Sequence, residues 1–167
     1  MSVYVDPYND ISEDICYGVT SRNLNLVEVE GNTMWDVANR LNLDSILIEL
    51  YPSKRAVVQG EIYGEGIQSN PLKVKGQHFA VYGLLVDEIR VPRAEWPKQI
   101  LELSVPVYTS LERATTMNEA LAQVDGIKSL INPKVNAEGV VWTTCDDQGN
   151  HYSYKCISSH YLLKHDK

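Results

Sequence analysis

The segment AVVQGEIYGEGIQSNPLK, residues 56–73, places carboxylates among glycines at the end of an apolar run. Glu61 follows the run AVVQG, and Gly64 and Gly66 come soon after it. A carboxylate at the end of a strand can accept hydrogen bonds from sugar hydroxyls, and glycines let the backbone approach a ligand closely. The alternative is an ordinary hairpin turn with a solvated glutamate, which these residues alone favour.

A second carboxylate–glycine pair, Glu138-Gly139, precedes the apolar run VVW, and Lys155 lies within the strand-like segment YSYKCIS. Glu138 is a suitable contact for Mg²⁺, often through water, because Mg²⁺ keeps much of its hydration. A lysine that faces a cleft needs an anion, since an unpaired ammonium is costly to bury. A strand-entry turn and an outward-facing lysine are the alternatives, and each residue by itself favours them.

Arg22, in the segment TSRN, also ends a predicted strand, at a position where most arginines are simply solvated. Together with Glu61, Glu138 and Lys155 it gives two carboxylates and two cations at strand ends. Such a set suits a nucleotide with a metal ion, because the cations match the phosphates and the carboxylates match the metal and the sugar.

The hydrophobic pattern predicts an α+β fold, with a mostly antiparallel sheet and helices inserted between hairpins. Predicted strands cover residues 2–6, 14–22, 56–64, 78–91 and 105–108, with a hairpin over 137–158 around the turn DDQGN. The near-continuous apolar run of 78–91 predicts burial on both faces of that strand. Predicted helices cover residues 31–43, capped by Asn32 or Thr33, and 43–51, 92–103, 115–126 and 127–133.

Composition limits the classes of protein further. The 167 residues suggest one domain, and 44% hydrophobic with 22% charged residues is typical of a globular chain. The net charge of −7 argues against a basic duplex-binding face, unless local cations or a metal supply the positive field. Cys16, Cys145 and Cys156 are scattered and form no metal-ligand spacing with the four histidines, which predicts reduced thiols. No apolar run approaches 18 residues, so we expect a soluble, cytoplasmic protein without a membrane span.

Five segments occur in an order that resembles the nucleotidyltransferase domain of ATP-dependent RNA ligases, in particular the bacterial and phage branch that resembles T4 RNA ligase 2. They are SRN, GEIYGEGIQSN, HFAVYGLLVD, AEGVVW and YKCISSHYLLK, and they span essentially the whole chain. The pattern GExxGxGIQxN is specific to that branch, whereas EGVV and a lone lysine are shared with DNA ligases and capping enzymes. The resemblance implies an ATP-grasp-like covalent nucleotidyltransferase (ligase adenylation) fold, of which residues 1–167 form a part.

The resemblance also implies a role for each site residue. Glu61 would hold the ribose of ATP, and Tyr82 would stack on adenine. Arg22 would contact the nucleotide or the 5′-phosphate end. Glu138 would support the catalytic Mg²⁺, and Lys155 would grip the α-phosphate. The implied activity is the sealing of RNA 3′-OH and 5′-phosphate ends in RNA repair, through a ligase–AMP and an RNA–adenylate.

The sequence departs from the family pattern in two places. Ile157 stands where the family often has a second lysine, and Lys164 is a weak candidate to replace it. No K-x-[DE]-G tetrapeptide occurs, although in the family this motif carries the nucleophilic lysine immediately before the strand that corresponds to residues 2–6. A C-terminal RNA-binding domain is not expected after Lys164.

The missing motif predicts a chain that is truncated and defective in self-adenylylation on its own, with an upstream polypeptide carrying K-x-[DE]-G as a partner. It also predicts an unpaired sheet edge beside residues 2–5. The alternative is a non-catalytic remnant that binds a nucleotide or a partner. An unrelated α+β domain would require the five segments to coincide by chance.

Overall fold

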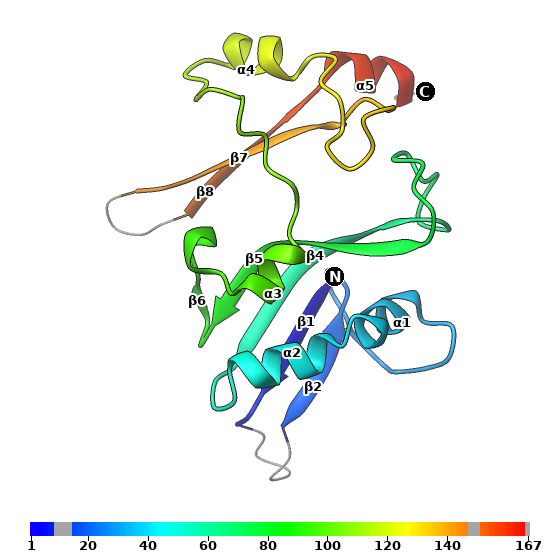
Figure 1. Ribbon diagram of the computed structural model, residues 1–167, viewed down its shortest axis with the longest axis vertical. Helices are drawn as coiled ribbons and strands as arrows, with labels where there is room; N and C mark the ends of the chain where they lie inside the picture. Colours follow the sequence, from blue (N-terminus) through cyan, green and yellow to red (C-terminus); the bar gives the residue numbers. More distant parts are fainter. Residues whose placement is uncertain (9–14, 147–150, 166–167) are drawn as a thin grey trace. The chain divides into compact units, whose positions relative to one another are not determined.

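The computed structural model describes residues 1–8, 15–146 and 151–165. The chain divides into two compact units, each of which is described by itself. Unit 1 comprises Met1–Asn70 and Lys75–Val105, and unit 2 comprises Pro71–Val74 and Pro106–Lys167. Figure 1 shows strands and short helices in both units, and all paired strands are antiparallel. The predicted α+β fold with a mostly antiparallel sheet is confirmed.

Unit 1 is built on a six-stranded sheet in the order β3-β2-β1-β4-β5-β6. The strands are β1 (Ser2–Asp6), β2 (Cys16–Thr20), β3 (Asn25–Leu26), β4 (Ala56–Gly64), β5 (Gln77–Val86) and β6 (Ile89–Arg90). Because β1 pairs with both β2 and β4, it lies in the interior of the sheet. The expectation of an unpaired edge beside residues 2–5 is therefore wrong.

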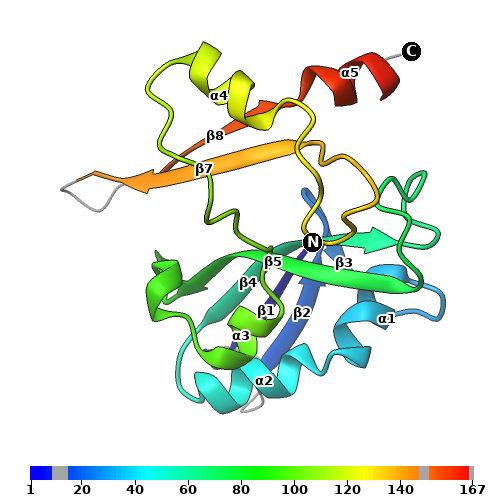
Figure 2. The same ribbon diagram turned by 45° about the horizontal axis from the view of Figure 1, so that its top comes forward.

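Alternating residues of these strands form one apolar face of the sheet. Val3 pairs with both Val19 and Val58, and all three side chains have no exposed surface. Helices α1 (Thr33–Arg40) and α2 (Leu43–Leu50) contribute their buried side chains to the same core. Figure 2 shows both helices on one side of the sheet. The opposite face of the sheet, called the polar face below, carries polar side chains and glycines together with the apolar pair Val57 and Leu85.

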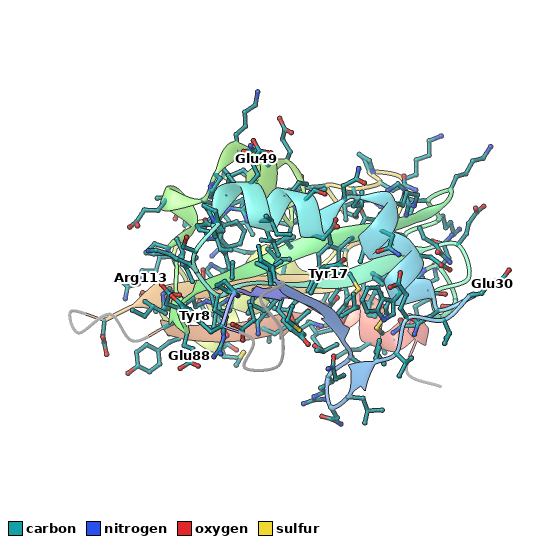
Figure 3. All side chains as sticks on the ribbon, turned by 90° about the horizontal axis from the view of Figure 1, so that it is seen from below. Tyr8, Tyr17, Glu30, Glu49, Glu88 and Arg113 are labelled. Carbon is teal, nitrogen blue, oxygen red and sulfur yellow. The ribbon has the colours of Figure 1, made fainter. Side chains whose placement is uncertain are left out.

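The first predicted helix of unit 1 begins as the capping rules require. The side chain of Asn32 accepts hydrogen bonds from the backbone N–H groups of Met34 (3.1 Å) and Trp35 (3.5 Å). The indole of Trp35 then donates to the carbonyl of Leu26 (3.0 Å), which ties α1 to the end of β3. Figure 3 shows Glu49 on the side of α2 that faces away from the sheet. The prediction that Asn32 caps the first helix is thus confirmed.

Two predicted elements of unit 1 are interrupted in the structure. The strand predicted over 78–91 divides into β5 and β6, because Asp87 and Glu88 both have positive φ angles (50° and 69°) and form a tight turn. The helix predicted over 92–103 divides into a 3₁₀ turn (Arg93–Glu95) and α3 (Lys98–Glu102). Proline at position 97 cannot donate a backbone hydrogen bond, so a continuous helix is impossible there.

Two further predicted elements do not form. Residues 105–108 are not a strand, although Ser104 makes an isolated parallel bridge with Val81. Residues 127–133 are an irregular loop and not a helix. The hydroxyl of Ser129 accepts hydrogen bonds from the N–H groups of Ile131 (3.2 Å) and Asn132 (3.3 Å), which gives the backbone an alternative to helical pairing.

Unit 2 consists of α4 (Met117–Val124), the hairpin of β7 (Gly139–Cys145) and β8 (His151–Ile157), and α5 (Ser159–His165). The predicted hairpin and the predicted helix over 115–126 are confirmed. Most of the predicted turn DDQGN lies outside the described residues. Ala120 and Val124 of α4 and Cys156 of β8 form a small buried cluster, with Val140 and Trp142 packed against it. The other face of the hairpin is not part of this cluster.

Two predictions from composition can be compared with the described part of the chain. Cys16 and Cys156 are free thiols. No described helix is both long and apolar enough to cross a membrane.

Candidate functional site

Glu61 lies on the polar face of the unit 1 sheet, near the end of β4. It pairs with Ala80 of β5, and its side chain is exposed. Its carboxylate makes no hydrogen bond or close ion pair with the described residues and interacts only electrostatically with the ammonium of Met1. The neighbouring Glu65 differs, because its carboxylate accepts a hydrogen bond from the N–H of Gly76 (2.8 Å) and so fastens the loop that leaves β4. Glu61 is therefore the carboxylate of this segment that is available to a ligand.

Tyr82 is the extra residue of a β-bulge in β5. Gln59 of β4 pairs with Gly83 and Gly60 pairs with Val81, so Tyr82 has no opposite residue. Val81 is fully buried on the apolar face, whereas Tyr82 points away from that face and is 47% exposed. Bulges commonly re-aim a side chain beside a functional site. Tyr82 therefore presents its ring on the polar face, one strand away from Glu61.

The bulge is held by residues that the sequence patterns did not single out. The guanidinium of Arg90, on β6, donates from Nη2 to the carbonyl of Tyr82 (3.2 Å). A Cβ atom at Gly83 would lie 3.0 Å from Arg90 Nη2 and 3.0 Å from Gln59 Oε1. Glycine at position 83 thus leaves the space that the arginine needs. Only the strand register reveals this relation, since nothing in the spacing of these residues is distinctive.

Arg22 lies at the same end of the sheet as Glu61. Thr20, Ser2 and Gln59 lie opposite one another on β2, β1 and β4. The residues that follow Thr20 and those that follow Gln59 therefore lie at the same end of the sheet. Neighbouring strands are about 4.8 Å apart, which puts these two chain ends roughly 10 Å apart across β1. Arg22 is exposed in the turn that follows β2, and no described residue forms an ion pair with it.

Glu138 and Lys155 meet in unit 2. Lys155 of β8 pairs with Val141 of β7, on the hairpin face opposite the buried Cys156. Lys155 Nζ donates to Glu138 Oε1 at 2.5 Å, and about half of each side chain is exposed (49% and 46%). The predicted lysine and carboxylate are thus direct partners, in a place that solvent reaches.

The structure places the five predicted site residues in two groups. Glu61 and Tyr82 lie on the polar face of the unit 1 sheet, and Arg22 lies in the turn at the same end of that sheet. Glu138 and Lys155 meet at the hairpin of unit 2. Among the described residues no group of three or more His, Cys, Asp or Glu side chains could hold a metal ion. The roles of these five residues remain predictions.

A network around Asp125 fixes the position of α5 in unit 2. Asp125 Oδ1 accepts from the hydroxyl of Ser158 (3.2 Å) and from the backbone N–H of His160 (3.2 Å), and it lies 2.9 Å from His160 Nδ1. Ser158 is fully buried, and its backbone N–H donates to the carbonyl of Glu138 (2.9 Å). Asp125 caps α5 and holds the segment that begins directly after β8.

The hydrogen bonds of Asp125 make the stability of unit 2 dependent on pH. The imidazole and backbone of His160, followed by the hydroxyl of Ser158, hold the pKa of Asp125 below its ordinary value of 3.8. A carboxyl group whose pKa is lower in the folded state stabilises the fold above its unfolded pKa and loses that effect as pH falls through the folded value. We expect denaturant unfolding followed over pH 2–6 to show a loss of stability below about pH 3.8.

Asp125→Asn should remove that part of the pH dependence, so that the variant is less stable than the wild type at pH 6 and approaches it at the acid end. Glu112→Gln, an exposed loop carboxylate of the same unit, serves as the control. Parallel pH profiles for wild type and Asp125→Asn would show that the network does not stabilise α5.

Comparisons with known proteins agree with this architecture. The model of the family described as RNA ligase matches residues 1–157. A mutant of Naegleria gruberi RNA ligase with ATP and Mn has a TM-score of 0.79 and 32% identity over 99% of this chain. Structures of the Naegleria enzyme with PPi, and of a mutant with AMP and Mn, both have TM-scores of 0.75 and 31% identity over 99% of this chain. A sequence comparison with curated proteins gave no significant match.

The fold is that of the nucleotidyltransferase part of an RNA ligase. The chain belongs to the RNA ligase family. It spans 48% of the length of these Naegleria chains.

Proposed function

We propose that this chain binds ATP with a divalent cation and forms the adenylation part of an enzyme that seals RNA 3′-OH and 5′-phosphate ends. The observation that carries this proposal is the exposed, unpaired Glu61 one strand away from the bulged Tyr82, in a chain of the RNA ligase family. Relatives that were solved with ATP and Mn support the choice of ligand.

The polar face of unit 1 suits the nucleoside. A tyrosine ring can stack on the flat face of adenine, and such stacking tolerates the hydroxyl group of the side chain. The carboxylate of Glu61 accepts hydrogen bonds only, which matches the hydroxyl donors of a ribose. Arg22, at the same end of the sheet, supplies a cation for a phosphate group of the nucleotide or of the RNA 5′ end.

The pair in unit 2 suits the phosphates. Lys155 and Glu138 neutralise each other in the structure, and an α-phosphate with its cation would give each of them a new partner of opposite charge. A single carboxylate is enough for Mg²⁺ or Mn²⁺ when phosphate oxygens and water complete the coordination. The cation would neutralise charge on the phosphates.

The proposed reaction begins with attack by a lysine amine on the α-phosphorus of ATP. An N–P bond forms, the bond from the α-phosphorus to the bridging oxygen breaks, and pyrophosphate leaves. The lysine would come from a K-x-[DE]-G segment joined to Met1. Gly60 N–H donates to the carbonyl of Met1 (3.0 Å), and Ser2 pairs with Gln59, so such a segment would extend β1 alongside Glu61.

Labelling with α-phosphate-labelled ATP tests the proposal. We expect the 167-residue chain to remain unlabelled, because Lys155 acts as a charge beside the α-phosphate and not as the attacking group. The same chain with an N-terminal extension that carries K-x-[DE]-G should become labelled and should seal nicked RNA.

The matched control is the same extension with alanine in place of its lysine, which should not be labelled. Strong labelling of the 167-residue chain would show that the nucleophile lies within it. An extended chain that binds ATP but is neither labelled nor able to seal RNA would favour the non-catalytic alternative.

A further inference from the structure

Two segments of this acidic protein contain lysines and no carboxylates. The whole chain has 22 acidic residues and a net charge of −7. Residues 66–86 nevertheless contain no Asp or Glu, and neither do residues 126–137. Lys73 and Lys75 lie in the first segment, and Lys128 and Lys134 lie in the second. Lys73, Lys128 and Lys134 belong to unit 2.

One amide side chain joins the two segments. Asn132 donates from Nδ2 to the carbonyl of Leu72 (2.8 Å), and its Oδ1 accepts from the backbone N–H of Lys134 (3.1 Å). Lys73 directly follows Leu72, so a single asparagine holds the backbones of Lys73 and Lys134 close together. We call the loops 71–74 and 129–134 the lysine loops.

The loop that carries Asn132 is held by hydrogen bonds of Ser129. The buried Ser129 bonds to the two backbone N–H groups described above, and its own N–H donates to the carbonyl of Val135 (3.0 Å). Lys128 lies beside this loop and donates to Asn136 Oδ1 (2.6 Å), which is a neutral partner. The structure therefore fixes the places from which the lysine side chains extend.

The charges of these lysines are not balanced within the described part of unit 2. Lys73 and Lys134 are exposed, and neither ammonium has a carboxylate partner among the described residues. Each ammonium can therefore bind an anionic ligand without giving up an existing ion pair.

We propose that the lysine loops bind the phosphate backbone of the RNA substrate. This inference rests on the proposed RNA-sealing function and adds a place where the RNA is held. Exposed Lys73 and Lys134 on neighbouring loops, with Lys128 beside them, suit a polyanion, because each can neutralise a different phosphate and release its counterions. The phosphates of a single ATP are already matched by Lys155 and its cation in the proposed site.

RNA binding measured over a range of salt concentrations tests this inference. The probe is a fluorescently labelled, nicked RNA duplex, titrated with the 167-residue chain at 50–200 mM KCl. We expect the double variant Lys73→Gln/Lys134→Gln to bind on the order of tenfold more weakly at 50 mM salt. The slope of log K against log salt should fall by roughly 1 for each lysine removed.

Two controls separate position from net charge. Lys54→Gln/Lys98→Gln removes the same charge from unit 1, where these lysines already pair with Asp87 and Glu102, and it should bind RNA like the wild type. Asn132→Leu keeps every charge but releases Leu72, so it should weaken RNA binding with little change in ATP affinity.

ATP titration of the same variants distinguishes the possible failures. The inference is overturned if the lysine double variant binds RNA as the wild type does, if both double variants lose affinity equally, or if the wild type binds no RNA. It is also overturned if the lysine variant loses ATP affinity in parallel with RNA affinity. In the first three cases, intact ATP binding would leave the proposed nucleotide site standing.

Discussion

Tyr82→Ala and Glu61→Ala are each expected to weaken ATP binding by about 1–3 kcal/mol, or roughly 5- to 150-fold. Stacking of a base on an aromatic side chain contributes about 1–3 kcal/mol, and a hydrogen bond to a charged group contributes about 1.5–3 kcal/mol. Both side chains are exposed, so their removal should leave the fold intact. Isothermal titration calorimetry with ATP and with AMP, in the presence of Mg²⁺ or Mn²⁺, measures the effect.

Matched controls come from the same unit. Tyr8→Ala and Glu49→Ala remove an exposed tyrosine and an exposed glutamate that lie elsewhere (Figure 3) and should bind ATP like the wild type. Tyr82→Phe should keep most of the affinity, because the stacking face is retained. Equal heats of binding for wild type, Tyr82→Ala and Glu61→Ala would remove the assignment of the nucleotide pocket.

Lys155→Ala is expected to slow self-labelling by about 10²- to 10³-fold in the chain that carries the K-x-[DE]-G extension. Loss of one group that stabilises developing charge in a transition state costs about that much in rate. ATP affinity should change less than the rate, since the lysine is proposed to act chiefly in the transition state. Single-turnover labelling at saturating ATP measures the rate directly.

Lys98→Ala, which removes an exposed lysine of α3, is the control and should label at the wild-type rate. Lys155→Arg should recover part of the rate, because it restores the positive charge with a different geometry. The Glu138–Lys155 pair is half exposed, so its loss should change the free energy of unfolding only slightly. A Lys155→Ala protein that labels at full rate would exclude this lysine from the reaction.

Much of the fold follows from local patterns in the sequence. Alternating Val3 and Val5 identify β1, and the apolar run of residues 56–58 identifies the first half of β4. The hairpin of unit 2 follows from two strand-like runs around a turn. Asn32 before an amphipathic run correctly predicts the start of α1. In these places a single physical requirement, burial of one face or capping of a helix end, determines the local structure.

The errors occur where two local requirements compete. Residues 127–133 have helix-like apolar spacing, but the Ser129 hydroxyl takes the N–H groups that would start a helix. The turn at Asp87-Glu88 lacks glycine and asparagine, so the apolar run around it resembles one long strand. The position of β1 between β2 and β4 depends on long-range pairing, which no local pattern contains.

Some residues of the candidate site can be predicted from the sequence, and others cannot. Residue type and position near strand ends single out Glu61, Glu138 and Lys155. Arg90 and Asn132 donate hydrogen bonds to the backbone carbonyls of Tyr82 and Leu72. These contacts can be seen only in the folded structure. The extra residue in β5 is likewise invisible in the sequence, since HFAVYGLLV is equally compatible with a regular strand.

The bulge at Tyr82 also bears on how this protein can evolve. Gly60 pairs with Val81 and Gln59 pairs with Gly83, so these two pairs would be consecutive if Tyr82 were absent. Loss of this one codon would turn β5 into a regular strand, with Val81 and Leu84 still on the buried face. Tyr82 is thus a one-residue insertion in an otherwise regular pairing of β4 with β5. A lineage could therefore lose the proposed adenine contact by a single in-frame deletion that keeps the pairing of β4 with β5.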